Sequence, residues 1–414
     1  MLNVANRTLF TGDNLDVMRG INSECIHLIY LDPPFNSNQD FAAPIGSEAA
    51  GAAFKDIWTL NDVDLAWHGQ IANEHPGLYA IIDAAGECHG KSMKAYLIMM
   101  GVRLLEMKRL LKPSGSIYLH CDPTASHYLK MVMDAVFGKG NFCREIIWHL
   151  RGASGFKARV NSWVRGHDTI LYFSNGEQLT FTKQYVPYDE AQLKRFSKKD
   201  NNGRVYKPIT KTRRIYLDES PGVPVTTVWS DIAGFQTVVN AKEKVGYPTQ
   251  KPLKLLERII KASSLEGQMV LDPFCGCATA CVAAEHLQRE WIGIDLAEKA
   301  ADLVRHRLAD ATGIFGKITH RTDIPVRTDV YQMKHYSNFK NELYGQQEGK
   351  CAGCKVLFPF RNMTVDHIIR KSKGGQDNEE NLQLLCGACN SMKGNRDMAY
   401  LLAKLQRMES KHIA

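Results

Sequence analysis

The first 330 or so residues alternate apolar, strand-like runs with amphipathic, helix-like segments, and this rhythm restricts the fold more than any other feature. In the stretch LLEMKRLLKPSGSIYLHCDP, a helix stops at Lys-Pro-Ser-Gly and a strand follows from Ser116 to His120. Strands that are separated by helices usually pair in parallel, because each connection has to cross the sheet. The pattern therefore predicts an α/β domain built on a mostly parallel sheet.

One predicted strand, IHLIYL, is followed directly by Asp-Pro-Pro-Phe. Two prolines remove two backbone donors and fix φ, so the strand has to stop and Asp32 and Phe35 lie on a stiff loop. That loop is at the carboxyl end of the strand, where open α/β sheets bind their ligands. The prolines could also be plain strand stops, but their position favours a site.

A second strand-to-helix junction is MVLDPFCGCATACVAAE, from Met269 to Glu285. Gly276 allows a close backbone turn, and the small residues after it open a helix whose N-terminal amides face the loop. The next strand, WIGIDL, ends at Asp295, about 20 residues on, where a carboxylate can accept both hydroxyls of a ribose. The Gly-x-Gly-x-x-Gly of a dinucleotide site is absent. A nucleoside cofactor without a pyrophosphate is the better fit.

Length and composition predict a protein of two or three domains without a membrane span. The chain has 414 residues, 44% of them hydrophobic and 23% charged. The N-terminus, MLNVANRTLFTGDN, has no apolar core of a signal peptide. We therefore expect a cytoplasmic or nucleoid-associated protein.

The net charge of +8 is concentrated in one segment. Between Asn175 and Arg214, ten Lys or Arg residues stand against four Asp or Glu residues, interleaved with aromatic side chains. This composition is typical of a surface that meets phosphates and bases, although a solvated basic face would have it too.

Two Cys-x-x-Cys pairs lie near the C-terminus: CAGC at Cys351–Cys354 and CGAC at Cys386–Cys389. In a reducing compartment such pairs are metal ligands, not disulfides. Four thiolates can complete one tetrahedral zinc site, which would stabilise a module of some 70 residues.

Three motifs together, LDPPFN, YPTQKP and LDPFCGCAT, resemble the amino-methyltransferases of DNA. They match the permuted class, in which the catalytic loop precedes the cofactor loop, and the resemblance covers residues 7 to 308. It implies a Rossmann-like fold, S-adenosylmethionine as cofactor, double-stranded DNA as partner and an inserted target-recognition region at about 175–230. The second glycine of the family's cofactor loop is Ala278 here.

The same resemblance implies roles for individual residues. The carboxylate of Asp32 and the carbonyl of Pro33 would accept hydrogen bonds from the target amine, and Phe35 would stack on the flipped base. The residues implied to hold the cofactor are Asp272, Phe274, Gly276 and Asp295, with Asp13 of FTGDN as a weaker candidate and Thr249, Gln250 and Lys251 closing over its methionine end.

The motifs also bear on which base is modified. Methylation of a cytosine ring carbon usually needs a Pro-Cys nucleophile, and no proline in this chain precedes a cysteine. Within the family, Asp at the first motif position is commoner for adenine and Ser for cytosine amines. Asp32 therefore favours adenine, with the cytosine amine as the alternative.

Between and after the cysteine pairs, TVDHIIRKSKGGQDNEENLQLLCGACNSMKG is similar to the HNH endonucleases, whose ββα unit holds one divalent ion. The resemblance implies that His367 deprotonates water, that Asp366 and Asn390 hold Mg²⁺, and that Asn381 fixes the loop near the histidine. Asn390 stands where the last His of the family's name is expected. The alternative is a zinc module that only binds DNA.

These predictions divide the chain into a methyltransferase domain at 1–325, a linker at 326–342 and a zinc-bound HNH domain at 343–414. A methyltransferase fused to a nuclease suggests restriction and modification in one chain, in a bacterium, an archaeon or a phage-infected cell. The sequence is compatible with a homodimer and does not identify the recognition site.

Overall fold

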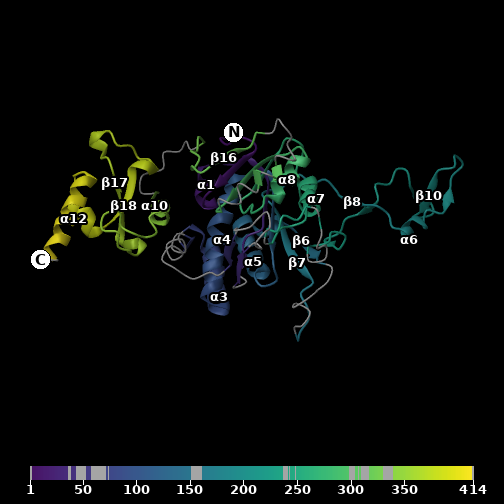
Figure 1. Cartoon of the computed structure of the whole chain (residues 1–414), viewed down its shortest axis with the longest axis horizontal. Helices are drawn as coiled ribbons and strands as arrows, with labels where there is room; N and C mark the ends of the chain where they lie inside the picture. The colour runs from purple at the N-terminus through teal and green to yellow at the C-terminus, as the bar shows by residue number, and fades with distance from the viewer. Residues whose placement is uncertain are drawn as a thin grey trace.

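The computed structural model describes most of the chain. The described residues are 2–35, 39–42, 53–56, 71–72, 74–150, 161–235, 241, 243–247, 249–297, 304–305, 307–308, 317–329 and 339–412. Figure 1 shows a central α/β body, with an arm that carries β8 and β10 on one side and the C-terminal module on the other.

A nine-stranded sheet in the order β13-β6-β7-β5-β2-β14-β15-β1-β16 forms the centre of the body. Among the described strands of this sheet, only β7 pairs antiparallel with its neighbours, β5 and β6, so the predicted mostly parallel α/β sheet is confirmed. The strands are β1 (Thr8–Thr11), β2 (Ile26–Leu31), β5 (Leu111–Cys121), β6 (Phe142–His149), β7 (His167–Ser174), β13 (Val228–Trp229), β14 (Met269–Asp272), β15 (Glu290–Asp295) and β16 (Thr319–Arg321).

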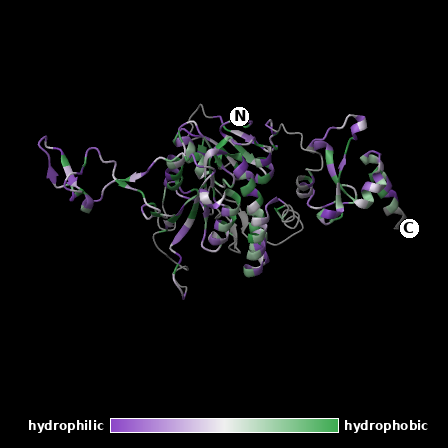
Figure 2. Cartoon of the chain, turned by 180° about the vertical axis from the view of Figure 1, so that it is seen from behind, coloured by the Kyte–Doolittle hydropathy of each residue, from purple (hydrophilic) through white to green (hydrophobic). Residues whose placement is uncertain are grey.

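Helices cover both faces of this sheet, and each face has its own apolar core. Strand β2 shows why: Ile29 and Leu31 point into one core, whereas Leu28 and Tyr30 point into the other. The first core is closed by α1 (Asn14–Gly20), α3 (Pro76–His89), α4 (Lys91–Leu110) and α5 (Ser126–Phe137). The second is closed by α7 (Leu253–Ser263) and α8 (Thr279–His286). Figure 2 shows the apolar residues gathered in this body.

The strand order places the two predicted loops side by side. Strands β2 and β14 are parallel neighbours, and Leu28 pairs with Val270. From this pair the chain leads through α3 and α4 to β5 on one side and through α8 to β15 on the other. The boundary is therefore a topological switch point, where open α/β sheets bind ligands.

One local prediction needs correction. Helix α4 ends at Leu110 and β5 starts at Leu111, so Lys-Pro-Ser-Gly belongs to the strand, which is longer than the predicted Ser116–His120. Between β2 and α4, the described residues form α3 and the hairpin of β3 (Gln39–Ala42) and β4 (Ala53–Asp56). Much of the rest of this segment lies outside the described residues.

The predicted target-recognition region forms most of the arm (Figure 1). It contains a three-stranded antiparallel sheet, β11-β10-β9, and a two-stranded pair, β12-β8. Its elements are β8 (Tyr185–Val186), α6 (Glu190–Leu193), β9 (Lys198–Lys199), β10 (Val205–Pro208), β11 (Arg214–Tyr216) and β12 (Val223–Pro224). The boundaries 175–230 stay a prediction.

The C-terminal module has a separate small core around the antiparallel pair of β17 (Met363–His367) and β18 (Leu382–Cys386). Helix α11 (Gly387–Lys393) follows β18 directly, so strand, strand and helix form a ββα unit. The module also contains the helices α10 (Lys340–Gln346) and α12 (Met398–His412).

Both ends of the predicted linker at 326–342 make contacts. The amide of Asn3 donates to the carbonyl of Val326, and the N–H of Ser23 donates to Asp329. At the other end, α10 packs on β18. The domain boundaries stay predictions.

Among the described residues, no helix is both long enough and apolar enough to cross a bilayer.

Candidate functional site

A pocket of about 970 Å³ opens at the carboxyl edge of the sheet. The loops after β1, β2, β14 and β15 line it, together with the segment that leads into α7. These four strands are parallel neighbours, so their following loops meet at one edge. The pocket thus brings together the residues that were implied for catalysis and cofactor binding in the methyltransferase: Asp13, Asp32, Pro33, Phe35, Lys251, Asp272, Phe274, Gly276 and Asp295.

The two carboxylate oxygens of Asp32 have different surroundings. Oδ2 forms a short ion pair with the ammonium of Lys251. Oδ1 is buried and has no hydrogen-bond partner among the residues that the structure describes. A buried acceptor without a partner is costly, so this oxygen marks a place where a ligand donor can bind.

Lys251 contacts the loop after β2. Its Nζ lies 3.1 Å from the carbonyl oxygen of Thr249 and 5.5 Å from the ring centroid of Phe35, in addition to its pair with Asp32. The implied role of Thr249, Gln250 and Lys251 in closing over the methionine end stays a prediction.

The cofactor loop turns sharply at two residues. Gly276 has a φ of 49°, and a Cβ there would lie 3.0 Å from Cε1 of Tyr247. Ala278, at the N-cap of α8, also has a positive φ, 54°, although an L side chain rarely adopts that region. The left-handed turn thus explains the family's glycine at this position, where the sequence alone shows only a departure from the motif.

Two carboxyls at the ends of neighbouring strands hold this loop. Oδ1 of Asp272 accepts the N–H of Phe274 at 3.2 Å, and Oδ2 of Asp295 accepts the N–H of Gly276 at 2.7 Å. Burial raises the pKa of Asp272 well above its usual range, and the charges of Asp32 and Asp295 add to the rise. Burial also raises the pKa of Asp295.

Asp13 has a structural task in this structure. Its Oδ1 accepts the N–H of Leu15 at 2.7 Å and caps α1, and its Oδ2 pairs with Arg103 at 2.9 Å. Asp13 still lines the pocket, as does Arg103.

The pocket is rich in hydrogen-bond acceptors. Four aspartates line it, and two of them pair with the cations Arg103 and Lys251. Carboxyl oxygens can accept the hydroxyls of a ribose, so the lining and the volume fit the nucleoside cofactor S-adenosylmethionine.

A group of residues next to Phe35 was not predicted from the sequence. His120 stacks on the Phe35 ring and binds both Tyr30 and Asp168, and Asp168 binds Arg165. His120 is the last residue of the predicted strand Ser116–His120, and Asp168 is the second residue of β7. These positions become informative only when the two strand ends are known to lie at the same edge of the sheet.

In the C-terminal module, Cys351, Cys354, Cys386 and Cys389 bring their Sγ atoms within 4.8 Å of one another. All four thiols are free, as predicted. Zn–S bonds of about 2.3 Å in a tetrahedron need four sulfur atoms this close together. The cluster therefore fits one structural zinc ion.

Of the predicted nuclease residues, Asp366 and His367 lie on β17, Asn390 lies on α11 and Asn381 lies directly before β18. Nε2 of His367 is 2.6 Å from Oδ1 of Asp377, and the backbone N–H of Ile369 donates to Oδ1 of Asn381 at 2.7 Å. Asn381 thus braces the loop after the histidine. The sequence analysis did not single out Asp377, which sits in the turn GGQDN.

Asp366 and Asn390 lie on one face of the unit. The Asn390 amide reaches Thr364, two residues before Asp366 on β17, at 3.5 Å. Their oxygens suit a hard cation such as Mg²⁺. The buried Lys393 nevertheless pairs with Asp366 at 2.9 Å, and Gln383 donates to the same carboxylate at 2.9 Å. The ammonium of Lys393 was not predicted from the sequence as part of this site.

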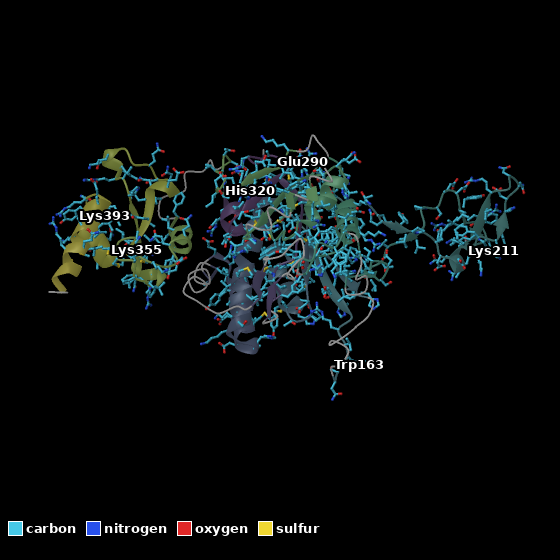
Figure 3. All side chains as sticks on the ribbon, in the orientation of Figure 1. Trp163, Lys211, Glu290, His320, Lys355 and Lys393 are labelled. Atoms are coloured by element: carbon cyan, nitrogen blue, oxygen red, sulfur yellow. The ribbon has the colours of Figure 1, made fainter. Side chains whose placement is uncertain are left out.

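The arm presents cations stacked on aromatic rings. Arg204 lies 4.2 Å from the ring centroid of Tyr216, and Arg214 lies 4.7 Å from that of Tyr206. Figure 3 places Lys211 on this arm, far from the body. Such surfaces suit the backbone and bases of a nucleic acid.

Together, the switch-point pocket and the loop with the open Asp32 oxygen define the class of nucleoside-cofactor α/β enzymes. The chain belongs to the DNA methylase family, whose model matches residues 26–306. A model of the HNH endonuclease family matches residues 351–396. These matches confirm the predicted combination of a DNA amino-methyltransferase with an HNH domain, and family membership supports S-adenosylmethionine as the cofactor.

Individual proteins show the same likeness. The type II methyltransferase M2.DpnII of Streptococcus pneumoniae is 52% identical over 302 residues, which cover 72% of this chain and 88% of the relative. The DNA adenine methyltransferase YhdJ of Escherichia coli is 24% identical over 290 residues, covering 70% and 78%. The solved structure of TTHA0409 from Thermus thermophilus, complexed with S-adenosyl-L-methionine, is 19% identical, with a TM-score of 0.42 over 77% of this chain and 99% of that one.

Proposed function

We propose that this protein transfers a methyl group from S-adenosylmethionine to the exocyclic amine of adenine in double-stranded DNA, and that its C-terminal module cleaves DNA. The observation that carries the methyltransferase assignment is the buried Oδ1 of Asp32, an acceptor without a partner among the described residues, at the edge of the pocket. An amine N–H is the donor that this oxygen lacks.

An exocyclic amine is a poor nucleophile because its lone pair is delocalised into the ring. Oδ1 of Asp32 and the carbonyl of Pro33 accept its two N–H groups and draw the nitrogen toward a tetrahedral state. Phe35 stacks on the base after it has left the duplex. Asp272, Gly276 and Asp295 would hold the cofactor in the pocket, and it would supply an electrophilic methyl group there.

Asp32 acts in this proposal through position and charge. Lys251 fixes its second oxygen, so the first is held toward the incoming amine. After methyl transfer the amine nitrogen is cationic, and the carboxylate of Asp32 stabilises its positive charge. The nitrogen then loses a proton, which Oδ1 of Asp32 accepts.

Adenine is proposed over cytosine on two grounds. The first motif residue is Asp32, which is commoner among adenine enzymes of the family, and one relative is named as a DNA adenine methyltransferase. A cytosine amine has the same hydrogen-bonding groups, so it is the second candidate.

For the nuclease, we propose that His367 deprotonates the attacking water. Asp377 accepts a hydrogen bond from the N–H at Nε2 of His367. This bond selects the tautomer in which Nδ1 is free to act as the base. Asp366 and Asn390 would hold Mg²⁺, which stabilises the charge of the scissile phosphate and leaving oxygen. A module that only binds DNA is the alternative, and His367→Ala would then leave every activity unchanged.

Restriction and modification in one chain is the proposed role, and it needs cleavage that depends on methylation. One incubation of the purified protein with unmethylated plasmid, Mg²⁺ and labelled S-adenosylmethionine tests both parts. We expect labelled N6-methyladenine in a nucleoside digest and nicked or cut plasmid on a gel. Labelled methylcytosine would show that the target base is cytosine and not adenine. Equal cutting of premethylated and unmethylated plasmid would rule out the restriction role.

A further inference from the structure

We propose that His120 is a positioning residue for methyl transfer: its imidazole holds the Phe35 ring in the orientation that receives the target base. This inference rests on the proposed stacking of the base on Phe35. It concerns a buried group of side chains that the proposed reaction does not otherwise use.

The contact between the two rings is the first observation. The ring of His120 lies 6.0 Å from that of Phe35, with an angle of 23° between their planes. Phe35 is half-buried and lines the pocket, whereas His120 is completely buried behind it. The imidazole therefore contacts Phe35 from the interior of the protein and not from the pocket.

Both nitrogens of the imidazole are bound, so the ring cannot rotate without losing a hydrogen bond. Nδ1 is 3.0 Å from the hydroxyl of Tyr30, and Nε2 is 3.2 Å from Oδ2 of Asp168. The carboxylate can only accept, so Nε2 carries a proton. Trp148 packs edge-on against the same imidazole, at 5.6 Å and 90°.

Asp168 is fixed in turn. Burial would raise the pKa of Asp168, but the hydrogen bond and charge of His120 and the charge of Arg165 lower it overall, so the carboxylate is ionised. Arg165 binds Asp168 and also reaches Oδ2 of Asp122 at 3.2 Å. Two strands and one loop thus hold the histidine, which makes it a rigid support.

The position of the support follows from the topology. His120 lies near the carboxyl end of β5, next to β2, and Tyr30 lies on β2 two residues before Asp32. Strand β7 is antiparallel to β5, so its second residue, Asp168, lies at the same edge. The support is therefore built into the sheet immediately beneath the catalytic loop, and it fixes Phe35 before DNA binds.

Preorganisation of this kind should affect DNA and not the cofactor, because Phe35 is the residue proposed to stack on the target base. A misplaced stacking ring should lower kcat/KM for DNA by about tenfold or more. The affinity for S-adenosylmethionine should stay unchanged. A histidine with a purely structural role would instead alter both together.

The test is a double-mutant cycle with His120→Gln, Phe35→Ala and the double variant. Glutamine keeps a donor for Asp168 but has no ring. If His120 acts through Phe35, the double variant methylates plasmid DNA as slowly as Phe35→Ala alone. If the two losses multiply, or if His120→Gln keeps the wild-type kcat/KM, the proposal is wrong.

Two further measurements keep the result interpretable. His27→Gln is the matched control, since His27 is also a bound histidine of the sheet, accepting the N–H of Met269 at 3.1 Å, but lies outside the pocket. It should leave kcat/KM unchanged. If the wild-type protein transfers no methyl group to DNA, the proposed function is wrong. The same three variants measured by thermal unfolding then still test whether His120 and Phe35 are coupled. Additive effects on stability would show that His120 does not support Phe35.

Discussion

The ammonium of Lys251 binds Oδ2 of Asp32 while Oδ1 of the same carboxylate has no partner among the described residues. The two residues are far apart in the chain and meet because the loop after β2 faces the segment that enters α7. One oxygen is thus fixed by the protein, and the other is left for the substrate.

Replacing Lys251 by methionine should lower kcat/KM for methyl transfer by about a hundredfold, because Asp32 loses the cation that orients it. The dissociation constant for S-adenosylmethionine should change little, which calorimetry can measure. Lys251→Arg should retain part of the activity. A large loss of affinity for S-adenosylmethionine, with kcat preserved at a saturating cofactor concentration, would indicate that Lys251 binds the methionine end of the cofactor instead.

Ala278 should tolerate glycine better than its neighbour Ala280 does. Both are buried, but Ala278 has a positive φ that costs an L residue about 1 to 2 kcal/mol, and Ala280 lies in helix α8. We expect Ala278→Gly to be nearly neutral in the free energy of unfolding, whereas Ala280→Gly destabilises by more than about 1 kcal/mol. Equal destabilisation of both variants in denaturant titrations would contradict the strain at Ala278.

Removal of the zinc ligands should unfold the C-terminal module and spare the methyltransferase. Cys351→Ser should lose bound zinc, measured by elemental analysis, and should make residues after 339 sensitive to proteases. Methyl transfer should continue at the wild-type rate. Cys88→Ser, at an exposed cysteine of α3, is the control and should change neither quantity. Wild-type protein without zinc would refute the site.

Asp377→Asn should lower DNA cleavage by about 10- to 100-fold, because the amide no longer selects the tautomer of His367. Asp397→Asn is the control, since Asp397 is an exposed acid of the same module that pairs with Lys373 instead of a histidine. Plasmid nicking measures both variants. Equal nicking by Asp377→Asn and wild-type protein would remove Asp377 from the mechanism.

The stability of the chain should fall between pH 6.5 and about 4 through His27. Burial, helped by the charge of Lys112, lowers the pKa of His27 to about 4, so the unfolded state binds its proton first as the pH falls. The stabilisation is fully present above pH 6.5. Because His27 is only half-buried, we expect a loss of about 1 kcal/mol at pH 5, and His27→Gln should abolish this slope in thermal unfolding.

Several features could be read from the sequence because they depend on neighbouring residues. The prolines after Leu31, the glycine turn before α8 and the two Cys-x-x-Cys pairs act locally, so the end of β2, the turn at Gly276 and the clustering of the four cysteines could be expected from the sequence. The roles of these residues in binding the cofactor and zinc stay predictions. The alternation of strands and helices was sufficient for the parallel sheet. Local signals are less exact at element ends, and β5 accordingly begins five residues before the predicted strand.

Only the tertiary structure decided which distant side chains meet. The pairing of Lys251 with Asp32, the support of Phe35 by His120 and the pairing of Lys393 with Asp366 each join different elements. The spacing of charged or aromatic residues in the sequence does not show which distant side chain each of them will contact. The partner depends on the strand order and on which residues end at the same edge, and those follow from packing the whole sheet.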